Sequence, residues 1–592
     1  MRQHAAVSAE LAELSAQLKR QHLGAILNTN ALARALYSSD ASLYRVAPQA
    51  VARPRTVEEL AAVLDAARTA EMPVTTRGAG TSCAGNAVGP GLVVDTSRHL
   101  NKIIEIDPDE RVARVEPGVV QATLQRAAAP FGLRFGPDPS THTRCTIGGM
   151  IGNNACGPRA LGYGKTADNV IGLDVVTGAG ERARFGRSGD GDASAAGGKL
   201  RSLVAANLAT IRTEFGRFGR QVSGYSLQHL LPENRFDVAR FLAGTEGTLA
   251  VVTGATVRLV AEAPHKIMIA LGYPTMADAG DAAPLVLPHG PTAAEGLDRR
   301  IIDVVRRTRG DGAVPPLPRG DGWMFVELVG TDAAELRHRA DALVGAAQAV
   351  DALVVSDPVQ ALALWKIRED GAGLAGVSLA RPAYAGWEDA AVPPDQLGAY
   401  LRDFDALLDD HRLDGLPYGH FGDGCVHVRI DFPLTEQGGV AAYRTFVEQA
   451  AKLVASYGGS MSGEHGDGRA RSALLPAMYS PSALELFGQV KACFDPDNRL
   501  NPGVLVDPRP VTEDLRTTAL VGRFDHFAEA VHRCTGVGKC LADNTAGLGV
   551  MCPSYLATRE EKDSTRGRAR VLQEMINGTV IRRGWQLSLI HI

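Results

Sequence analysis

The sequence predicts an α+β protein with more than one domain. A chain of 592 residues is too long for a single hydrophobic core, so two to four domains are expected. Between residues 40 and 505, short strand patterns alternate with helical patterns, and glycine-rich loops join many of them. The sequence changes character near residue 261, where the glycine-rich loops give way to apolar strand patterns separated by helical stretches.

These changes of pattern predict five segments. The expected order is a helical arm (1–39), a first domain (40–262), a second α+β domain (263–505), a proline-rich linker (506–530) and a cysteine-containing segment (531–592).

Composition excludes several classes of protein. Hydrophobic residues make up 45% and charged residues 22%, which are ordinary values for globular proteins. The net charge of -4 offers no basic footprint for nucleic acid, and eight cysteines in this length form no disulfide framework. The sequence has neither a secretory signal nor an apolar run long enough for a membrane span. A cytoplasmic enzyme is therefore expected.

The first domain is predicted to begin with a strand, a helix and two more strands. Residues 51–54 form a short strand pattern that ends at a proline. Thr56 and Glu59 have the spacing of a capping box, which predicts that a helix starts here. Residues 72–76 and 92–95 are the next strand patterns, and the first of them runs directly into a glycine-rich loop.

Glycine-rich loops are the first candidate binding elements. The loop Arg77–Gly85 can bring successive backbone N–H groups towards an anion, and its serine, threonine and arginine add further donors. It lacks the G-x-G-x-x-G of a nicotinamide site, and taken alone it also fits a plain tight turn. Further glycine-rich stretches at 136–140, 146–157 and 244–249 favour an extended ligand, such as a dinucleotide, lying along the backbone.

A second group of residues has the composition of a metal site. His420, His427 and the pair Glu464–His465 stand among glycines, and two histidines with one carboxylate are common in metal centres. If Glu464 and His465 lie in extended backbone, their side chains point in opposite directions, one to a metal and one to a substrate. The alternative is a set of unrelated polar loop residues.

The strand pattern around His427 adds an arginine to this group. Apolar residues alternate with polar ones over 426–432, which predicts a half-buried strand. His427 and Arg429 then share its polar face, and His420 is expected in the turn before the strand.

The order of Pro54, Arg77–Gly85, 137–139, 148–157 and 244–248 along the chain resembles that of a known family. The first domain is similar to the FAD-binding domain of the vanillyl-alcohol-oxidase (PCMH) type. Residues 40–505 resemble the FAD-linked D-2-hydroxyacid dehydrogenases, the D-lactate, glycolate and D-2-hydroxyglutarate group. The resemblance implies a two-subdomain FAD-binding domain followed by an α+β substrate (cap) domain. Because the Arg77–Gly85 loop contains no histidine, non-covalent FAD is expected.

The resemblance also implies roles for individual residues. The expected FAD contacts are Arg77, Gly78, Ala79, Gly80, Thr81, Ser82, Gly85, Pro137, Asp138, Thr146, Gly149, Asn153, Gly157, Glu246 and Asn501. His420, His427 and Glu464 are the expected ligands of a divalent metal, Zn²⁺ or a similar ion, with His465 as catalytic base.

Three residues are expected to contact the substrate. Arg368 resembles the arginine with which the family binds the substrate carboxylate, although a surface arginine paired with an acidic residue is the alternative. D-2-hydroxyglutarate-specific relatives often carry lysine at the position of Trp387 and asparagine at that of Arg429. The distal group of the substrate is therefore open.

The C-terminal segment resembles part of an iron–sulfur module. Cys534, Cys540 and the Cys552–Pro553 pair are similar to an incomplete C-x-x-C-x-x-C-x-x-x-C-P run, with Val537 at the middle cysteine position. Large bacterial members of the family carry an α-helical, ferredoxin-like module here. We expect the chain to be the front part of a longer protein, with a 4Fe–4S cluster only in the full-length form. Free thiols and a partial zinc site are the alternatives.

Together these features predict a flavin-dependent oxidation of a D-2-hydroxyacid to the 2-oxoacid. Hydride passes to flavin N5, and the electrons continue through iron–sulfur centres to a quinone or protein carrier. A metallohydrolase built on His420, His427 and Glu464, and a non-catalytic electron-transfer subunit, are the alternatives. The sequence also allows peripheral association with the inner face of the membrane and formation of a homodimer.

Overall fold

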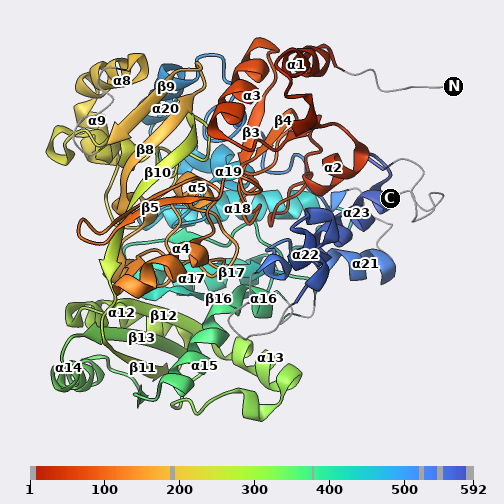
Figure 1. Ribbon diagram of the computed structural model, residues 1–592. Helices are drawn as coiled ribbons and strands as arrows, with labels where there is room; N and C mark the ends of the chain where they lie inside the picture. Colours follow the sequence, from red (N-terminus) through yellow and green to blue (C-terminus); the bar gives the residue numbers. More distant parts are fainter. Residues whose placement is uncertain are drawn as a thin grey trace.

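The computed structural model describes residues 8–186, 194–376, 379, 381–518, 526–542 and 551–581. Their strands form a four-stranded, a six-stranded and a seven-stranded sheet. The two smaller sheets belong to the first domain, in the upper part of Figure 1, and the largest sheet forms the second domain below them. The C-terminal helices lie at the right, beside both domains. The predicted α+β class is confirmed.

The four-stranded sheet opens the first domain. Its strand order is β1-β2-β4-β3; β2, β4 and β3 are parallel, and β1 is antiparallel to β2. The predicted cap is present, because the Thr56 side chain accepts a hydrogen bond from the Glu59 N–H at the start of α3. The elements are β1 (Leu27–Asn28), β2 (Ala50–Ala52), α3 (Val57–Thr69), β3 (Val74–Arg77) and β4 (Leu92–Asp95).

The N-terminal segment lies inside this domain rather than outside it as an arm. It contains α1 (Ala9–Arg20) and α2 (Ala31–Leu36), with β1 between them, because Asn30 caps a new helix after the chain has paired with β2. Leu14 and Leu18 of α1 are fully buried in the apolar cluster beneath α3. Residues 8–36 are therefore part of the first core.

The six-stranded sheet completes the first domain. All of its pairings are antiparallel, and the long strand β10 joins most of it. The strands are β5 (Ile103–Asp107), β6 (Val112–Val115), β7 (Leu133–Phe135), β8 (Val170–Thr177), β9 (Arg182–Gly186) and β10 (Ala250–Ala261). The helices of this part are α4 (Gln121–Ala128), α5 (Ile147–Asn153), α6 (Ala160–Tyr163), α7 (Thr166–Asn169), α8 (Ala195–Ala206), α9 (Leu208–Glu214) and α10 (Val238–Leu242).

The seven-stranded sheet of the second domain is antiparallel throughout, in the order β14-β11-β13-β12-β16-β17-β15. Helices cover both of its faces, so alternate strand residues enter separate apolar clusters. The strands are β11 (His265–Tyr273), β12 (Ala293–Asp298), β13 (Gly322–Gly330), β14 (Asp351–Val355), β15 (Ala390–Ala391), β16 (Gly415–His420) and β17 (Cys425–Ile430). The helices are α11 (Met276–Asp281), α12 (Ala283–Val286), α13 (Arg299–Arg309), α14 (Ala333–Ala346), α15 (Pro358–Glu369), α16 (Gly371–Ala375), α17 (Leu397–Asp410) and α18 (Gly439–Ser456).

The strand around His427 differs from the prediction in one respect. Every residue of β17 is buried, whereas its alternating pattern predicted a half-buried strand. Its apolar residues enter the core, and its polar residues face the interior between the two domains instead of solvent. His420 is the last residue of β16 rather than part of a free turn.

The chain then returns to the first domain. After α19 (Gly468–Arg471), helix α20 (Pro481–Phe494) packs against α8. The described C-terminal helices are α21 (His526–His532), α22 (Pro553–Thr558) and α23 (Thr565–Asn577). Val571 and Met575 of α23 share an apolar cluster with Leu36 and Val93, so this segment is packed onto the first domain.

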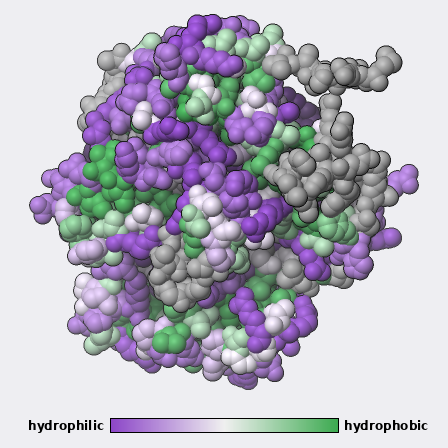
Figure 2. Space-filling model, turned by 45° about the vertical axis from the view of Figure 1, so that its right-hand side comes forward, coloured by the Kyte–Doolittle hydropathy of each residue, from purple (hydrophilic) through white to green (hydrophobic). Residues whose placement is uncertain are grey.

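The surface is mostly polar on the side that carries these C-terminal helices. Figure 2 shows hydrophilic residues over most of this face, with hydrophobic residues in separate patches. Within the described part of the chain, no helix combines the length and the apolar character needed to cross a membrane.

Truncation of one buried side chain of α1 tests whether the N-terminal segment belongs to the first core. We expect Leu14→Ala to lower the free energy of unfolding by about 2–5 kcal/mol, because it removes a fully buried leucine side chain. Equilibrium urea unfolding measures the change. Arg20→Ala, whose side chain is 60% exposed on the same helix, should stay within about 0.5 kcal/mol of the wild type. Wild-type stability of Leu14→Ala would instead indicate a detached arm.

Candidate active site

An elongated cavity of about 1210 Å³ lies between the two domains. The glycine-rich loops of the first domain line one part of it, and α15, β16 and β17 of the second domain line another. Residues of the C-terminal segment, including Lys539 and Met551, complete the wall. This volume lies above the ordinary range for a drug-sized ligand, so it suits a large extended one.

Most residues expected to contact FAD line this cavity. They are Arg77, Gly78, Ala79, Gly80, Thr81, Ser82, Thr146, Gly149, Asn153, Gly157 and Glu246. The remaining four support these loops from behind. Gly85 packs on Tyr44, the Pro137 carbonyl accepts a hydrogen bond from Gln121, Asp138 pairs with Arg159, and the Asn501 amide donates to the carbonyls of Asn86 and Glu246.

The loop after β3 has the properties of an anion site. Among the described residues, no protein acceptor meets the backbone N–H groups of residues 78–83. Gly80 has a positive φ of 63°, and a Cβ on Gly78 would lie only 2.3 Å from Thr146 Oγ1. The glycines therefore permit a turn whose free donors can converge on phosphate oxygens.

At the end of the cavity, three potential ligand atoms converge. His420 Nε2 lies 3.0 Å from Glu464 Oε1 and 3.2 Å from His427 Nε2, and His427 Nε2 lies 3.3 Å from the same carboxylate oxygen. Ligand atoms around a tetrahedral zinc ion lie roughly 3.3 Å apart, given metal–ligand distances of about 2.0–2.2 Å. The spacing fits a bound divalent ion.

The outer nitrogens of the two histidines support this interpretation. His420 Nδ1 lies 2.8 Å from Glu295 Oε1, and His427 Nδ1 lies 3.0 Å from the Glu388 carbonyl oxygen. Both oxygens accept, so each Nδ1 carries a hydrogen, and the Nε2 of each ring faces Glu464, where it can hold either a proton or a metal ion. Burial alone lowers the pKa of His420, but Glu295 and Glu464 outweigh it and raise the pKa to about 9. The site thus attracts a positive charge.

The second oxygen of Glu464 is held by the first domain. Glu464 Oε2 accepts hydrogen bonds from the Gly157 N–H at 2.8 Å and from Arg220 Nη1 at 3.3 Å. Arg220 is 1% exposed and also pairs with Asp423 of the second domain at 2.8 Å. These contacts turn Oε1 of Glu464 towards the histidines. They also connect the cluster of His420, His427 and Glu464, which we call the metal-type cluster, to Gly157 on the wall of the cavity.

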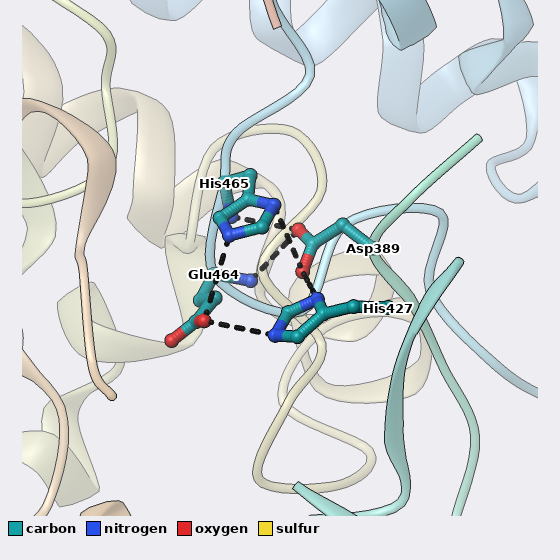
Figure 3. Close-up of side chains that lie close together, drawn as sticks. All are labelled: Asp389, His427, Glu464 and His465. Atoms are coloured by element: carbon teal, nitrogen blue, oxygen red, sulfur yellow. Dashed lines mark hydrogen bonds and ion pairs between the residues drawn. The ribbon is translucent and has the colours of Figure 1, made fainter. Parts of the chain in front are cut away.

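The loop that carries Glu464 and His465 is fixed by one buried carboxylate. Asp389 Oδ2 accepts hydrogen bonds from the backbone N–H groups of Gly463, Glu464 and His465 at 2.9, 3.0 and 2.7 Å, and from the Ser462 hydroxyl at 2.7 Å. The loop is bent rather than extended, so Glu464 and His465 do not point in opposite directions as predicted. Both side chains reach the same cluster (Figure 3).

His465 has the surroundings of a general base. Its Nδ1 faces Glu388 Oε1 at 3.4 Å and Asp389 Oδ1 at 3.7 Å, and its Nε2 lies 3.5 Å from Glu464 Oε1. The ring stacks on His427 with centroids 4.8 Å apart (Figure 3). Burial lowers the pKa of His465, but Asp389 and Glu388 outweigh it and raise the pKa. The side chain is 28% exposed, so it reaches the cavity.

Arg368 is buried beside the metal-type cluster. Its Nη2 lies 2.5 Å from Glu295 Oε2, and its guanidinium lies over the Tyr418 ring at 5.3 Å. The arginine therefore has an acidic partner, as the alternative interpretation required, but it lies on the cavity wall and not on the surface. Glu295 connects it to His420.

Arg429 and Trp387 occupy different environments. Arg429 lines the cavity and is 5% exposed, and no carboxylate of the described residues lies within ion-pair distance of it. Trp387 lies in the apolar core behind the wall and does not line the cavity. Burial lowers the pKa of Arg429, but Cys83, Tyr418 and Glu388 outweigh it and raise that pKa, so these groups stabilise the guanidinium.

The cysteines of the C-terminal segment do not form a comparable group. Cys540 and Cys552 share a small apolar cluster, and Cys534 is partly exposed. The group of metal-type side chains found across the described ranges, Asp389, His427, Glu464 and His465, contains no cysteine. The iron–sulfur module stays a prediction, and residues 543–550 between two of the cysteines lie outside the described residues.

Sequence reasoning missed the residues that hold the cluster in place. Strand β12 consists of alanine, glycine and leucine apart from Glu295 and the final Asp298. A carboxylate within such an apolar strand is a signal that its side chain is buried. Asp389 stands two residues after Trp387 and gave no separate signal. Arg220 lies in a loop without a recognisable motif.

Comparison with known families agrees with this geometry. Residues 48–186 match the description "FAD binding domain", and residues 262–505 match "FAD linked oxidases, C-terminal domain". In solved structures, the fold resembles a 4-ethylphenol oxidase from Gulosibacter chungangensis (TM-score 0.62, 14% identity) over 85% of this chain and 98% of that one. It also resembles p-cresol methylhydroxylase (TM-score 0.60, 14% identity) over 84% and 97%.

Two curated relatives cover most of the chain. A D-lactate dehydrogenase of Archaeoglobus fulgidus is 32% identical over 79% of this chain and 95% of the relative. A D-2-hydroxyglutarate dehydrogenase of Pseudomonas putida is 32% identical over 96% of this chain, which spans 60% of that relative's length.

The match to the D-lactate dehydrogenase extends over nearly all of the relative, and both FAD-oxidase domain descriptions fall on the two domains that enclose the cavity. The chain belongs to the family of FAD-linked oxidases.

Proposed function

We propose that the chain oxidises a D-2-hydroxyacid to the 2-oxoacid, with FAD in the cavity and a divalent metal ion at His420, His427 and Glu464. The observation that carries the proposal is the meeting of three ligand atoms within 3.3 Å, beside His465, at the end of the FAD cavity. The names of the relatives, D-lactate dehydrogenase and D-2-hydroxyglutarate dehydrogenase, support the same class of substrate.

The bound groups supply two kinds of chemistry. FAD, when bound, accepts the two electrons and the hydrogen that leave the substrate carbon. A divalent ion, when bound, lowers the pKa of a hydroxyl group that it contacts. The protein's own part is to hold the hydroxyacid and to remove its hydroxyl proton.

His465 is the proposed base for that proton. Its Nδ1 side faces Glu388 and Asp389, so the imidazolium that forms after proton transfer is stabilised by two buried carboxylates. The raised pKa of His465 favours proton uptake from the substrate. Asp389 additionally fixes the backbone from which His465 projects.

Arg368 and Arg429 are the proposed anion-binding residues. Arg368 lies next to His420, so it can hold the carboxylate adjacent to the reacting carbon, while Glu295 keeps its guanidinium oriented. Arg429, which has no carboxylate partner among the described residues, can neutralise a second, distal carboxylate. A dicarboxylic D-2-hydroxyacid is therefore the proposed substrate, and Arg429 the residue that distinguishes it from D-lactate.

The electrons are proposed to leave the flavin for iron–sulfur centres and then a quinone or protein carrier. The approach of the C-terminal segment to the cavity, through Val537 and Lys539, supports an exit on this side.

Replacement of His465 tests the function. We expect His465→Asn to slow anaerobic reduction of the bound flavin by a D-2-hydroxyacid about 10²- to 10⁴-fold, because it removes the base. Stopped-flow absorbance at the flavin band measures the rate for D-2-hydroxyglutarate and D-lactate, with the L-enantiomers alongside.

The matched control is His338→Asn, an exposed histidine on α14, which should react at the wild-type rate. A wild-type protein whose flavin no D-2-hydroxyacid reduces would favour a non-catalytic subunit. Unchanged rates in His465→Asn would exclude this residue as the base.

Replacement of Arg429 tests the substrate class. We expect Arg429→Gln to raise the KM for D-2-hydroxyglutarate roughly 10-fold or more, because one charge-assisted contact to the distal carboxylate is lost. The KM for D-lactate, which lacks that group, should change little. Steady-state kinetics with an artificial electron acceptor measure both, and Arg337→Gln on the exposed face of α14 is the control. Equal losses for the two substrates would contradict a distal-carboxylate role.

A further inference from the structure

Helix α23 of the C-terminal segment carries a buried arginine that faces the first glycine loop. Arg566 is 3% exposed, and Glu561 holds its guanidinium from one side with contacts of 2.7 Å to Nε and 2.8 Å to Nη2. This two-pronged ion pair fixes the plane of the guanidinium. The remaining nitrogen, Nη1, is therefore presented in a defined direction.

Nη1 of Arg566 reaches the backbone of the FAD loop. It donates to the Ala79 carbonyl at 2.9 Å, lies 3.5 Å from the Gly80 carbonyl, and donates to the Gly536 carbonyl at 3.2 Å. Residues almost 490 positions apart are thus in direct contact. No sequence motif indicated this pairing.

These contacts determine where the loop's N–H groups point. In a trans peptide, the C=O of one residue and the N–H of the next are antiparallel, and the described chain contains no cis peptide. Because the carbonyls of Ala79 and Gly80 turn towards Arg566, the N–H groups of Gly80 and Thr81 turn away from it. Neither N–H has a protein acceptor among the described residues, and both residues line the cavity.

Arg566 also adds positive charge behind the same loop. The Arg77 guanidinium lies beneath Gly80, and Arg570 of α23 donates to the Asp40 carbonyl close by. Burial, Arg566 and Arg77 together lower the pKa of Arg570 to about 9, which reflects how closely the three cations gather. Glu561 and Asp40 are the nearby acidic groups. The loop therefore carries aligned N–H dipoles and a positive field on one side.

We propose that Arg566 is a positioning residue of the FAD site: it fixes the 78–82 loop for the FAD pyrophosphate and supplies part of the charge that attracts it. The C-terminal segment is then a component of the cofactor site in this chain, in addition to any role in electron transfer. The inference rests on FAD binding and does not depend on which hydroxyacid is oxidised.

Ligand titrations of the flavin-free full chain test the proposal. We expect Arg566→Met to weaken FAD binding about 10-fold or more, and ADP binding by a similar factor, because both ligands contain the pyrophosphate. Adenosine, which lacks it, should bind as tightly as to the wild type. Quenching of FAD fluorescence gives the dissociation constant for FAD, and competition gives those of ADP and adenosine.

Two further variants complete the experiment. Arg568 lies on the exposed side of α23, where its side chain donates to the Ser554 hydroxyl, so Arg568→Met should match the wild type for all three ligands. Arg566→Lys keeps the charge and the stem but loses the fork to Glu561, so it should show a smaller loss for FAD and ADP. If Arg566→Met does not fold, the affinities of Arg566→Lys for FAD and ADP test the proposal.

Wild-type affinity for FAD in both Arg566 variants would overturn the proposal. An equal loss for adenosine and ADP would also overturn it, because that result assigns Arg566 a general structural role. Failure of the substrate assignment would leave these ligand affinities unchanged, so the two outcomes are distinguishable.

Discussion

The convergence of two histidine nitrogens and one carboxylate oxygen in a buried pocket is the constraint on which the candidate site depends. Hydrogen bonds to Glu295 and to the Glu388 carbonyl place the hydrogens of His420 and His427 on their outer nitrogens. Their inner lone pairs then face Glu464 across 3.0–3.3 Å. With both rings neutral this arrangement is repulsive, and either a proton on His420, whose pKa is raised to about 9, or a bound cation in its place relieves the repulsion.

Both domains contribute to holding this arrangement. Glu464 receives one hydrogen bond from Gly157 of the first domain and one from Arg220, which also reaches Asp423 of the second. Asp389 fixes the loop that carries Glu464 and His465. Hydrogen bonds therefore connect the cluster of His420, His427 and Glu464 to the first domain, and the three residues line the same cavity as the glycine-rich loops.

Local features of the sequence could be predicted, and long-range ones could not. The Thr56 cap, the strand around His427 and the glycine loop after β3 depend on neighbouring residues, and each is present. The burial of β17 and the position of His420 depend on the packing between domains, which the strand pattern does not contain. Glu295 lies 125 positions from His420, and Arg566 lies 487 positions from Ala79, so no spacing rule connects them.

The family resemblance supplied the roles of His465 and Arg368, whereas their charge environment came from the structure. Arg368 has an ion-pair partner in Glu295, whereas no carboxylate of the described residues lies within ion-pair distance of Arg429, and the substrate-binding roles of both arginines stay predictions.

Metal removal tests the central claim most directly. The holoenzyme, with FAD retained, is treated with a chelator and then assayed for metal content by elemental analysis and for anaerobic flavin reduction by D-2-hydroxyglutarate. We predict about one divalent ion per chain before treatment, loss of flavin reduction after it, and recovery when Zn²⁺ or another first-row ion is restored. Full-rate flavin reduction in metal-free protein would contradict a metal-assisted reaction at His420, His427 and Glu464.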